Sequence, residues 1–115
     1  IYRVLQDTEN QRKVLLLAAE GTTGPLAYAS KSALANLDLE QGKGDEAISR
    51  FQDLRTHSEG FFAEQATMDL ALALEHLGKK GEARQTYQEF LSTWPESSLT
   101  EEAERRHSML EENDG

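Results

Sequence analysis

The stretch Gly42-Lys43-Gly44-Asp45 is the first candidate for chemistry, because glycines beside a lysine can wrap a phosphate group. The common phosphate-binding loop has the spacing GxxxxGK[ST] and follows a strand. This chain has neither that spacing nor a strand pattern before the stretch. A turn between two helices explains it better, with Asp45 as the N-cap of the second helix, because Asp is a preferred N-cap residue. We therefore predict a turn here and no phosphate site.

The three histidines, His57, His76 and His107, are the second candidate, since histidine is a common metal ligand and acid–base catalyst. They lie in three different helical segments and lack the HExxH spacing of a zinc site. The chain also has no Cys, which excludes disulfides and thiolate metal ligands. We predict packed or solvated histidines, no metal site and no cofactor.

Acidic side chains near the C-terminus are the third candidate, because general acid–base catalysis often uses carboxyl groups. Such a role needs an apolar cleft that shifts the pKa of the carboxyl group, whereas this segment is strongly polar. Glu102 and Arg106 are spaced i,i+4 for an ion pair on one helix. The chain has no GxSxG nucleophile motif. We predict solvated carboxylates and no enzyme; the acidic residues considered are Glu101, Glu102, Glu104, Glu111 and Glu112.

The composition narrows the class of partner. A formal net charge of −9 and a pI near 4.7 argue against nucleic acid or an anionic membrane, since both attract positive surfaces. The apolar run Val14–Ala19 is far shorter than the roughly 20 residues that cross a bilayer. The sequence starts at Ile1 without a Met or a signal-peptide pattern, so we interpret it as a fragment of a longer protein.

Two segments, Leu34–Leu54 and Leu70–Phe90, repeat one pattern. In each, a Leu-Ala pair is followed by a glycine-rich turn, and then by an Ala and an aromatic ring. The equivalent alanines are Ala47 and Ala83, so the period is 83 − 47 = 36 residues. Apolar residues recur at helical spacing, and no segment alternates with period two. We therefore predict an all-α chain of antiparallel helix pairs joined by short glycine turns.

We predict one domain over residues 1–115 with about six helices. The last helix has an apolar stripe that contains one charged residue, Arg106. Whether residues 1–20 form one helix or two stays open. The predicted parts are an N-terminal helix and loop (1–24), a first repeat (25–60), a second repeat (61–97) and a C-terminal capping helix with its tail (98–115). The predicted helices span about residues 25–41, 61–77 and 82–93. Another helix begins at the cap Asp45 and stops between residues 57 and 60. The last helix is capped by Ser97 or Ser98 and ends at about residue 112.

This pattern resembles the tetratricopeptide repeat, a helix–turn–helix unit of about 34 residues. The resemblance covers residues 25–98. The second copy fits well, although Thr67 stands at the position of the usual Trp. The first copy is looser, with Lys31 at the usual Trp, Asp38 at the usual Tyr and Glu59 at the usual Pro. The resemblance implies a right-handed α-solenoid and a non-enzymatic scaffold that binds a protein or peptide segment on its concave face. The matching residues of the second copy are Leu70, Ala71, Ala83, Tyr87, Phe90 and Pro95.

The chain is also similar to bacterial envelope proteins of this superfamily, including the periplasmic domain of the ancillary subunit of the Sec translocon. The similar features are a first helix, the entry GTTGPLAYA and two degenerate repeats that end in Trp-Pro-Glu-Ser. This resemblance implies a membrane-anchored parent protein in an envelope or translocation assembly. It favours a periplasmic location, with a cytoplasmic location as the alternative.

The resemblance also implies which residues line the binding groove. In the family's carboxylate clamp, Lys and Asn hold a C-terminal carboxylate. Asn36 fits one clamp position, but Ser32 replaces the expected Lys and Leu72 the expected Asn. A mixed groove of this kind favours an amphipathic or apolar segment, since methionine adapts to varied shapes. Packing against the next helix is the alternative for each residue. The implied groove residues are Ser32, Asn36, Leu39, Gln65, Met68, Leu72, Glu75 and His76.

A second function stays open from the sequence. An apolar first helix, around Leu15–Leu17, could dock on another copy of the chain. The chain would then be a structural module that makes its parent protein a homo-oligomer.

Overall fold

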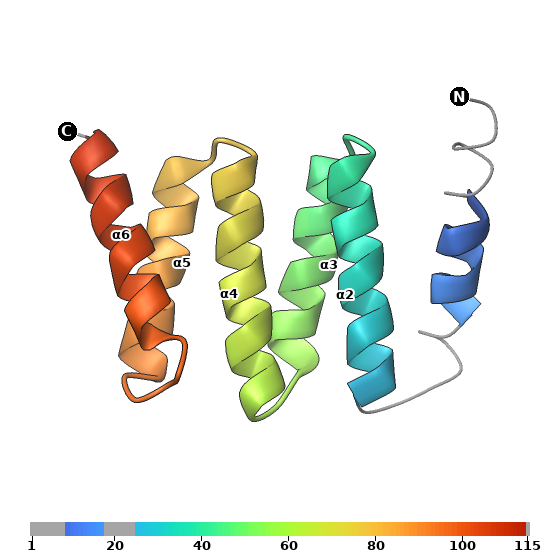
Figure 1. Cartoon of the computed structure of the whole chain (residues 1–115), viewed down its shortest axis with the longest axis horizontal. Helices are drawn as coiled ribbons and strands as arrows, with labels where there is room; N and C mark the ends of the chain where they lie inside the picture. Colours follow the sequence, from blue (N-terminus) through green and yellow to red (C-terminus); the bar gives the residue numbers. More distant parts are fainter. Residues whose placement is uncertain (1–8, 18–24, 115) are drawn as a thin grey trace. The chain divides into compact units, whose positions relative to one another are not determined.

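A computed structural model describes residues 9–17 and 25–114 of the chain, and every regular element in these residues is an α-helix (Figure 1). The prediction of an all-α helical repeat is confirmed. The right-handed coiling of a solenoid stays a prediction. The questions about residues 1–8 and 18–24, including one helix or two, lie outside the described residues. Residues 9–17 are helical, and the complete helices are α2 (Pro25–Glu40), α3 (Gly44–His57), α4 (Phe61–His76), α5 (Lys80–Thr93) and α6 (Thr100–Asp114).

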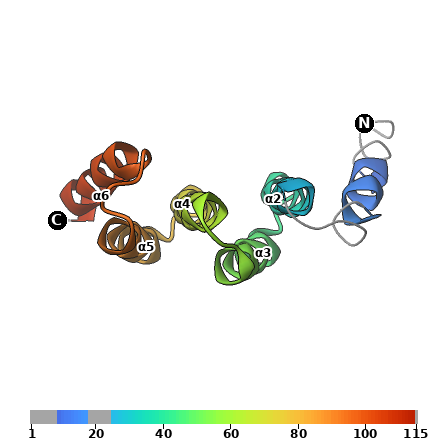
Figure 2. The ribbon, with the colours of Figure 1, turned by 90° about the horizontal axis from the view of Figure 1, so that it is seen from below.

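The chain divides into two compact units, Ile1–Arg50 and Phe51–Gly115, with the boundary inside α3. We call them the N-terminal unit and the C-terminal unit and describe each by itself. In the C-terminal unit, α4, α5 and α6 run in alternating directions, and both α4 and α6 pack against α5 (Figures 1 and 2). The prediction of a single domain over residues 1–115 stays a prediction.

The two glycine turns have the same pattern of backbone hydrogen bonds. Gly42 and Gly78, which are 78 − 42 = 36 residues apart, have left-handed φ angles of 76° and 79°. After each glycine, the N–H of a lysine donates to the carbonyl five residues back, at 2.7 Å for Lys43 and 2.9 Å for Lys79. This is the Schellman arrangement that ends a helix on a left-handed glycine. The period of 36 residues therefore holds for the turns as well as for the side chains.

Two predicted helix starts are wrong. Helix α3 begins at Gly44, and the carbonyl of Lys43 accepts the first helical bond from Ala47 at 3.1 Å. Asp45 therefore lies in the first turn and is not the N-cap. Its negative charge there interacts favourably with the positive end of the helix dipole. Helix α5 begins at Lys80, two residues before the predicted start at residue 82, so Gly81 lies in the helix.

The start of α6 also differs from the prediction of a Ser97 or Ser98 cap. The helix begins at Thr100, and the carbonyl of Leu99 accepts from Ala103 at 3.1 Å. The Ser97 hydroxyl instead accepts a hydrogen bond from the Leu99 N–H at 3.1 Å, which shapes the turn before the helix. The helix ends differ from the predicted ones by one or two residues: α2 ends at Glu40, α4 at His76 and α6 at Asp114.

The residues that define the repeat form the core. Four alanines are fully buried, which lets neighbouring helices pack closely, and two rings fill the remaining space. Because these side chains are enclosed, the surface available to a partner consists of the less regular residues between them. The buried alanines of the repeat pattern are Ala35, Ala47, Ala71 and Ala83, and its buried rings are Phe51 and Tyr87.

A buried carboxylate ties the N-terminal unit together. The side chain of Asp38 on α2 is fully buried. The Arg12 guanidinium lies 2.7 Å from its Oδ1 in an ion pair, and Arg50 Nε on α3 donates to its Oδ2 at 2.8 Å. Arg12 also donates to the side chain of Gln41. One carboxylate therefore joins the helix of residues 9–17 to α2 and α3, at the position where the resembled family usually has a Tyr.

None of the helices among the described residues is both long enough and apolar enough to cross a membrane.

Candidate protein-binding surface

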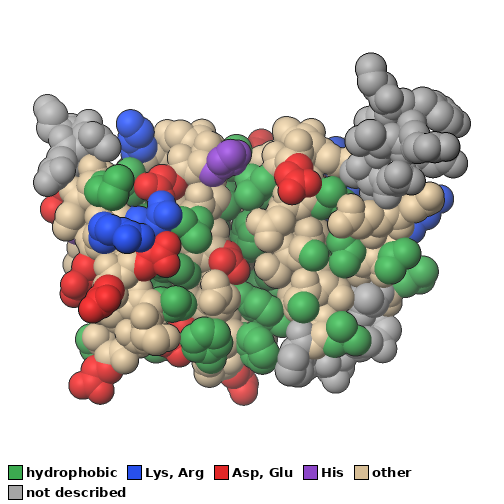
Figure 3. Space-filling model, in the orientation of Figure 1, with side chains coloured by type: hydrophobic (Ala, Val, Ile, Leu, Met, Phe, Trp, Pro, Cys, Tyr) green, Lys and Arg blue, Asp and Glu red, His purple; other side chains and the backbone are tan. Residues whose placement is uncertain are grey.

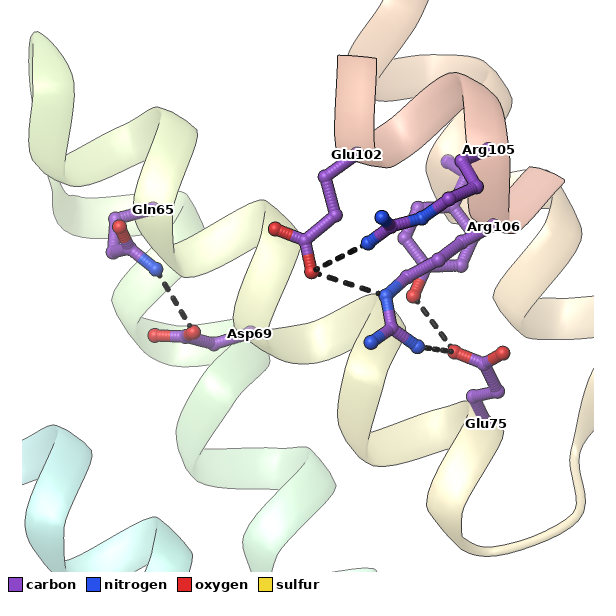
Figure 4. A network of polar contacts seen from close by, with 7 residues as sticks. Gln65, Asp69, Glu75, Glu102, Arg105 and Arg106 are labelled. Atoms are coloured by element: carbon purple, nitrogen blue, oxygen red, sulfur yellow. Dashed lines mark hydrogen bonds and ion pairs between the residues drawn. The ribbon is translucent and has the colours of Figure 1, made fainter. Parts of the chain in front are cut away.

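A polar network joins the three helices α4, α5 and α6 of the C-terminal unit (Figure 4). The carboxylate of Glu75 on α4 accepts a hydrogen bond from the Tyr87 hydroxyl on α5 at 2.9 Å. The same oxygen, Oε2, accepts from Nη1 of Arg106 on α6 at 3.1 Å. One carboxylate oxygen therefore fixes a phenol and a guanidinium that come from two other helices.

The network continues along α6. Arg106 Nε donates to Glu102 Oε1 at 3.1 Å, so the predicted i,i+4 pair is confirmed. Nη2 of Arg105 lies 3.9 Å from the same oxygen. Arg106 thus holds two carboxylates, one on its own helix and one on α4, and sets their positions on the surface.

The environment keeps the protonation states of Tyr87 and Arg106 constant near neutral pH. Burial raises the pKa of the Tyr87 hydroxyl above its usual range, and the hydrogen bond and negative charge of Glu75 raise it further. Burial alone would lower the pKa of Arg106. The hydrogen bond to Glu102 and the electrostatic interactions with Tyr87 and Glu75 outweigh burial, so the pKa of Arg106 is raised. Tyr87 is therefore a neutral donor and Arg106 a cation at neutral pH. The network is suited to hold a surface in shape.

The predicted groove residues of the C-terminal unit have different surroundings in the structure. Gln65, Leu72 and Glu75 are half-buried, and His76 is exposed. Gln65 donates to the carboxylate of Asp69 at 3.0 Å, one turn further along α4. Met68 is only 2% exposed, so its side chain packs in the core, and we leave it out of the surface proposed below.

The predicted groove residues of the N-terminal unit all lie on α2. Ser32 and Leu39 are half-buried, and Asn36 is exposed. Because they belong to a different unit from the α4 residues, a single groove that joins both sets stays a prediction.

Four accessible residues of α6 were missed as site residues: Glu102, Arg105, Arg106 and Met109. A charge inside an apolar stripe signals that a counter-ion lies within reach, and Arg106 gave that signal. Its partner Glu75 is 31 residues away in the chain, so helical spacing alone does not identify it. Met109 is 49% exposed, although the stripe residue beside it, Leu110, is buried.

His57 and His107 each contact a residue one turn away on their own helix. Nδ1 of His57 lies 2.9 Å from the carbonyl of Asp53, one turn back on α3. Nε2 of His107 lies 3.9 Å from the carboxylate of Glu111. Within residues 9–17 and 25–114, no three metal-binding side chains come together.

We expect Tyr87→Phe to lower the free energy of unfolding by about 1.5 kcal/mol, because a buried hydrogen bond to a charged acceptor is lost. Urea unfolding followed by the fluorescence of Trp94, the single tryptophan, measures it. In a double-mutant cycle with Glu75→Gln, the two changes should couple by about 1 kcal/mol. Additive effects would show that the hydroxyl and the carboxylate do not interact.

The comparisons with known proteins agree with this geometry. A family model described as Tetratricopeptide repeat matches residues 65–97, which run from α4 through α5 to the turn before α6. The matched residues lie within the predicted second repeat, 61–97. No curated protein and no solved structure matches the chain, so the envelope proteins that the sequence resembles find no support there. The match supports the tetratricopeptide repeat superfamily over residues 65–97.

Proposed function

We propose that this chain is a non-enzymatic scaffold that binds a segment of another protein on one face of its C-terminal unit. The observation that carries the proposal is the tetratricopeptide repeat at residues 65–97, since such repeats in general bind proteins or peptides. We define the α4–α6 face by eight of the accessible side chains of these two helices: Gln65, Leu72, Glu75, His76, Glu102, Arg105, Arg106 and Met109.

The spacing of these residues supports the proposal. Leu72 and His76 follow Gln65 by seven and eleven residues, which places the three side chains on one side of α4. Glu102 and Met109 are likewise seven residues apart on α6. Figure 3 views the molecule from the side on which α4 and α6 lie in front of α5, where acidic, basic and hydrophobic side chains are interspersed.

The character of the face fits an amphipathic or apolar segment. Leu72 and Met109 offer accessible apolar contacts, and methionine adapts to partners of varied shape. The contacts of Glu75 with Tyr87 and Arg106 hold the face in one arrangement before a ligand binds. Such preorganisation lowers the entropic cost of binding.

We expect Leu72→Glu to weaken peptide binding at least tenfold, about 1.4 kcal/mol, because a charge enters an apolar contact. Random peptides displayed on phage are selected on the chain, and the dissociation constants of synthetic copies are measured by fluorescence anisotropy. Leu91→Glu is the matched control, since Leu91 is also half-buried but lies on α5. Circular dichroism melting confirms that both variants fold.

Two outcomes count against the proposal. If the selection yields no binding peptide, the chain is not a peptide-binding scaffold of this kind. If the selected peptides bind the Leu72 variant as tightly as the unchanged chain and are lost with the Leu91 variant, the site lies on α5 and not on the α4–α6 face.

The proposed setting of the scaffold is a bacterial envelope or translocation assembly. This part of the proposal rests on the resemblance of the GTTGPLAYA entry and the repeat ends to proteins of that compartment. Fractionation of cells that express the parent protein tests it, with the periplasmic or membrane fraction as the expected result. Recovery from the cytosol alone would reject the envelope setting.

A second candidate function is self-association through residues 9–17. It is favoured by Val14 and Leu17, two large apolar side chains of this helix that are well exposed. Sedimentation velocity over a range of concentrations tests it, because a dimer would form as the concentration rises. A monomer at every concentration excludes this candidate.

A further inference from the structure

Resting on the proposed function, we infer that the segment bound by the α4–α6 face is basic and amphipathic. Its Lys or Arg side chains would lie against Glu75 and Glu102, and its apolar side chains against Leu72 and Met109. This inference names the chemistry of the partner, which the repeat itself leaves open.

The charge of the chain is concentrated in the C-terminal unit. Residues 51–115 hold 14 acidic residues against 6 Lys and Arg, a formal charge of −8. Residues 1–50 hold 7 acidic residues against 6 Lys and Arg, a formal charge of −1. A surface with this excess attracts cationic segments and speeds their association, and it repels a second copy of itself. The unit that carries the repeat thus selects for a basic partner.

The cations of the face are already matched by carboxylates. Arg106 pairs with both Glu75 and Glu102, and Arg105 lies near Glu102. Arg106 is therefore poorly placed to attract an acidic segment. A carboxylate of a partner would have to compete with two glutamates that the fold holds in position.

The two carboxylates remain within reach of a partner. The side chains of Glu75 and Glu102 are 22% and 39% exposed. Both contacts of Glu75 fall on Oε2, and the contacts of Glu102 fall on Oε1. A carboxylate has two acceptor oxygens, so each glutamate can take a further donor from a bound cation.

Apolar side chains lie at helical spacing from the charged residues of this network. Leu72 precedes Glu75 by three residues on α4, and Met109 follows Arg106 by three residues on α6. A segment with cationic and apolar sides, such as an amphipathic basic helix, matches both kinds of contact. A wholly apolar segment would remove water from Glu75 and Glu102 without replacing its hydrogen bonds, which is unfavourable.

The test uses three fluorescent peptides of 18 residues with one amphipathic helical pattern of Leu. Lys occupies the polar positions of the first peptide, Gln those of the second and Glu those of the third. Fluorescence anisotropy in low salt measures the affinity of each for the full chain. We expect the Lys peptide to bind at least tenfold more tightly than the Gln peptide, and the Glu peptide not to bind.

Matched variants locate the site. We expect the Lys peptide to bind the double variant E75Q/E102Q at least tenfold more weakly. The control E101Q/E104Q removes the same charge from exposed positions of α6, and we expect a change below twofold. Melting curves report folding, and E102Q alone leaves the contacts between Glu75, Tyr87 and Arg106 in place. This single variant should still weaken binding about threefold.

The outcomes separate this inference from the proposed function. Equal losses in the two double variants would show a general attraction and overturn the inference. It is also overturned if the Gln peptide binds as well as the Lys peptide, or if the Lys peptide does not bind at all. In each of these cases the proposed function stands if the phage-selected peptides still depend on Leu72.

Discussion

Replacing Phe90 with alanine is expected to lower the free energy of unfolding of the C-terminal unit by about 3–5 kcal/mol, the usual cost of removing a buried ring. The side chain of Phe90 on α5 is fully buried. Its ring lies 5.3 Å from the ring of Trp94, centroid to centroid, at a tilt of 56°. Alanine would remove this contact and leave a cavity that rigid helices fill only in part.

Urea unfolding followed by Trp94 fluorescence measures this loss, because Trp94 is the single tryptophan and lies beside the substituted ring. The control is Phe61→Ala at the start of α4, where the ring is exposed. We expect a change within about 0.5 kcal/mol there. Similar losses in the two variants would show that burial of Phe90 does not stabilise the unit.

The second large effect is expected from Asp38→Ala in the N-terminal unit, with a loss of about 3 kcal/mol in local stability. The substitution removes the carboxylate that pairs with Arg12 and Arg50 and leaves their charges without a counter-ion. Both guanidinium groups keep some contact with water, which places the effect at the lower end for a broken buried pair. The helix of residues 9–17 should lose its attachment to α2.

Amide hydrogen exchange tests this expectation residue by residue. Protection should fall in residues 9–17 and in α2, whereas α4 to α6 should keep theirs. Asp38→Asn, which keeps the shape of the side chain, should give a similar loss if the charge is what matters. Glu40→Ala removes the same charge from an exposed position of α2 and should leave exchange almost unchanged. Loss of protection in this control would assign the effect to net charge.

The architecture could be predicted because its determinants are local and periodic. Alanines and rings at helical spacing identify the buried stripes, and Gly42 and Gly78 mark the turns. The helix starts were harder to predict, since several residues near a turn can cap a helix. Asp45 was a plausible cap by type, but the Schellman turn after Gly42 brings Lys43 to that position.

The candidate surface could be predicted only in part, because it depends on contacts between distant residues. The pair of Glu102 and Arg106 follows from helical spacing alone. Their link to Glu75 and Tyr87 needs the packing of α4 and α6 on α5, which no local pattern encodes. The ion pair between Asp38 and Arg12 could not be predicted from the repeat pattern either, because Arg12 lies outside the predicted repeat.

The turns at Gly42 and Gly78 share one backbone arrangement, and this affects how such a chain can lengthen. Residues 43–78 form a 36-residue stretch that begins just after the left-handed Gly42 and ends on the left-handed Gly78. Inserting a second copy of this stretch after Gly78 would create a Gly-Lys junction identical to the native one at Gly78 and Lys79. No new kind of turn is needed at the seam. Gene duplication, or a designer, can therefore extend the array in steps of one repeat without inventing a linker.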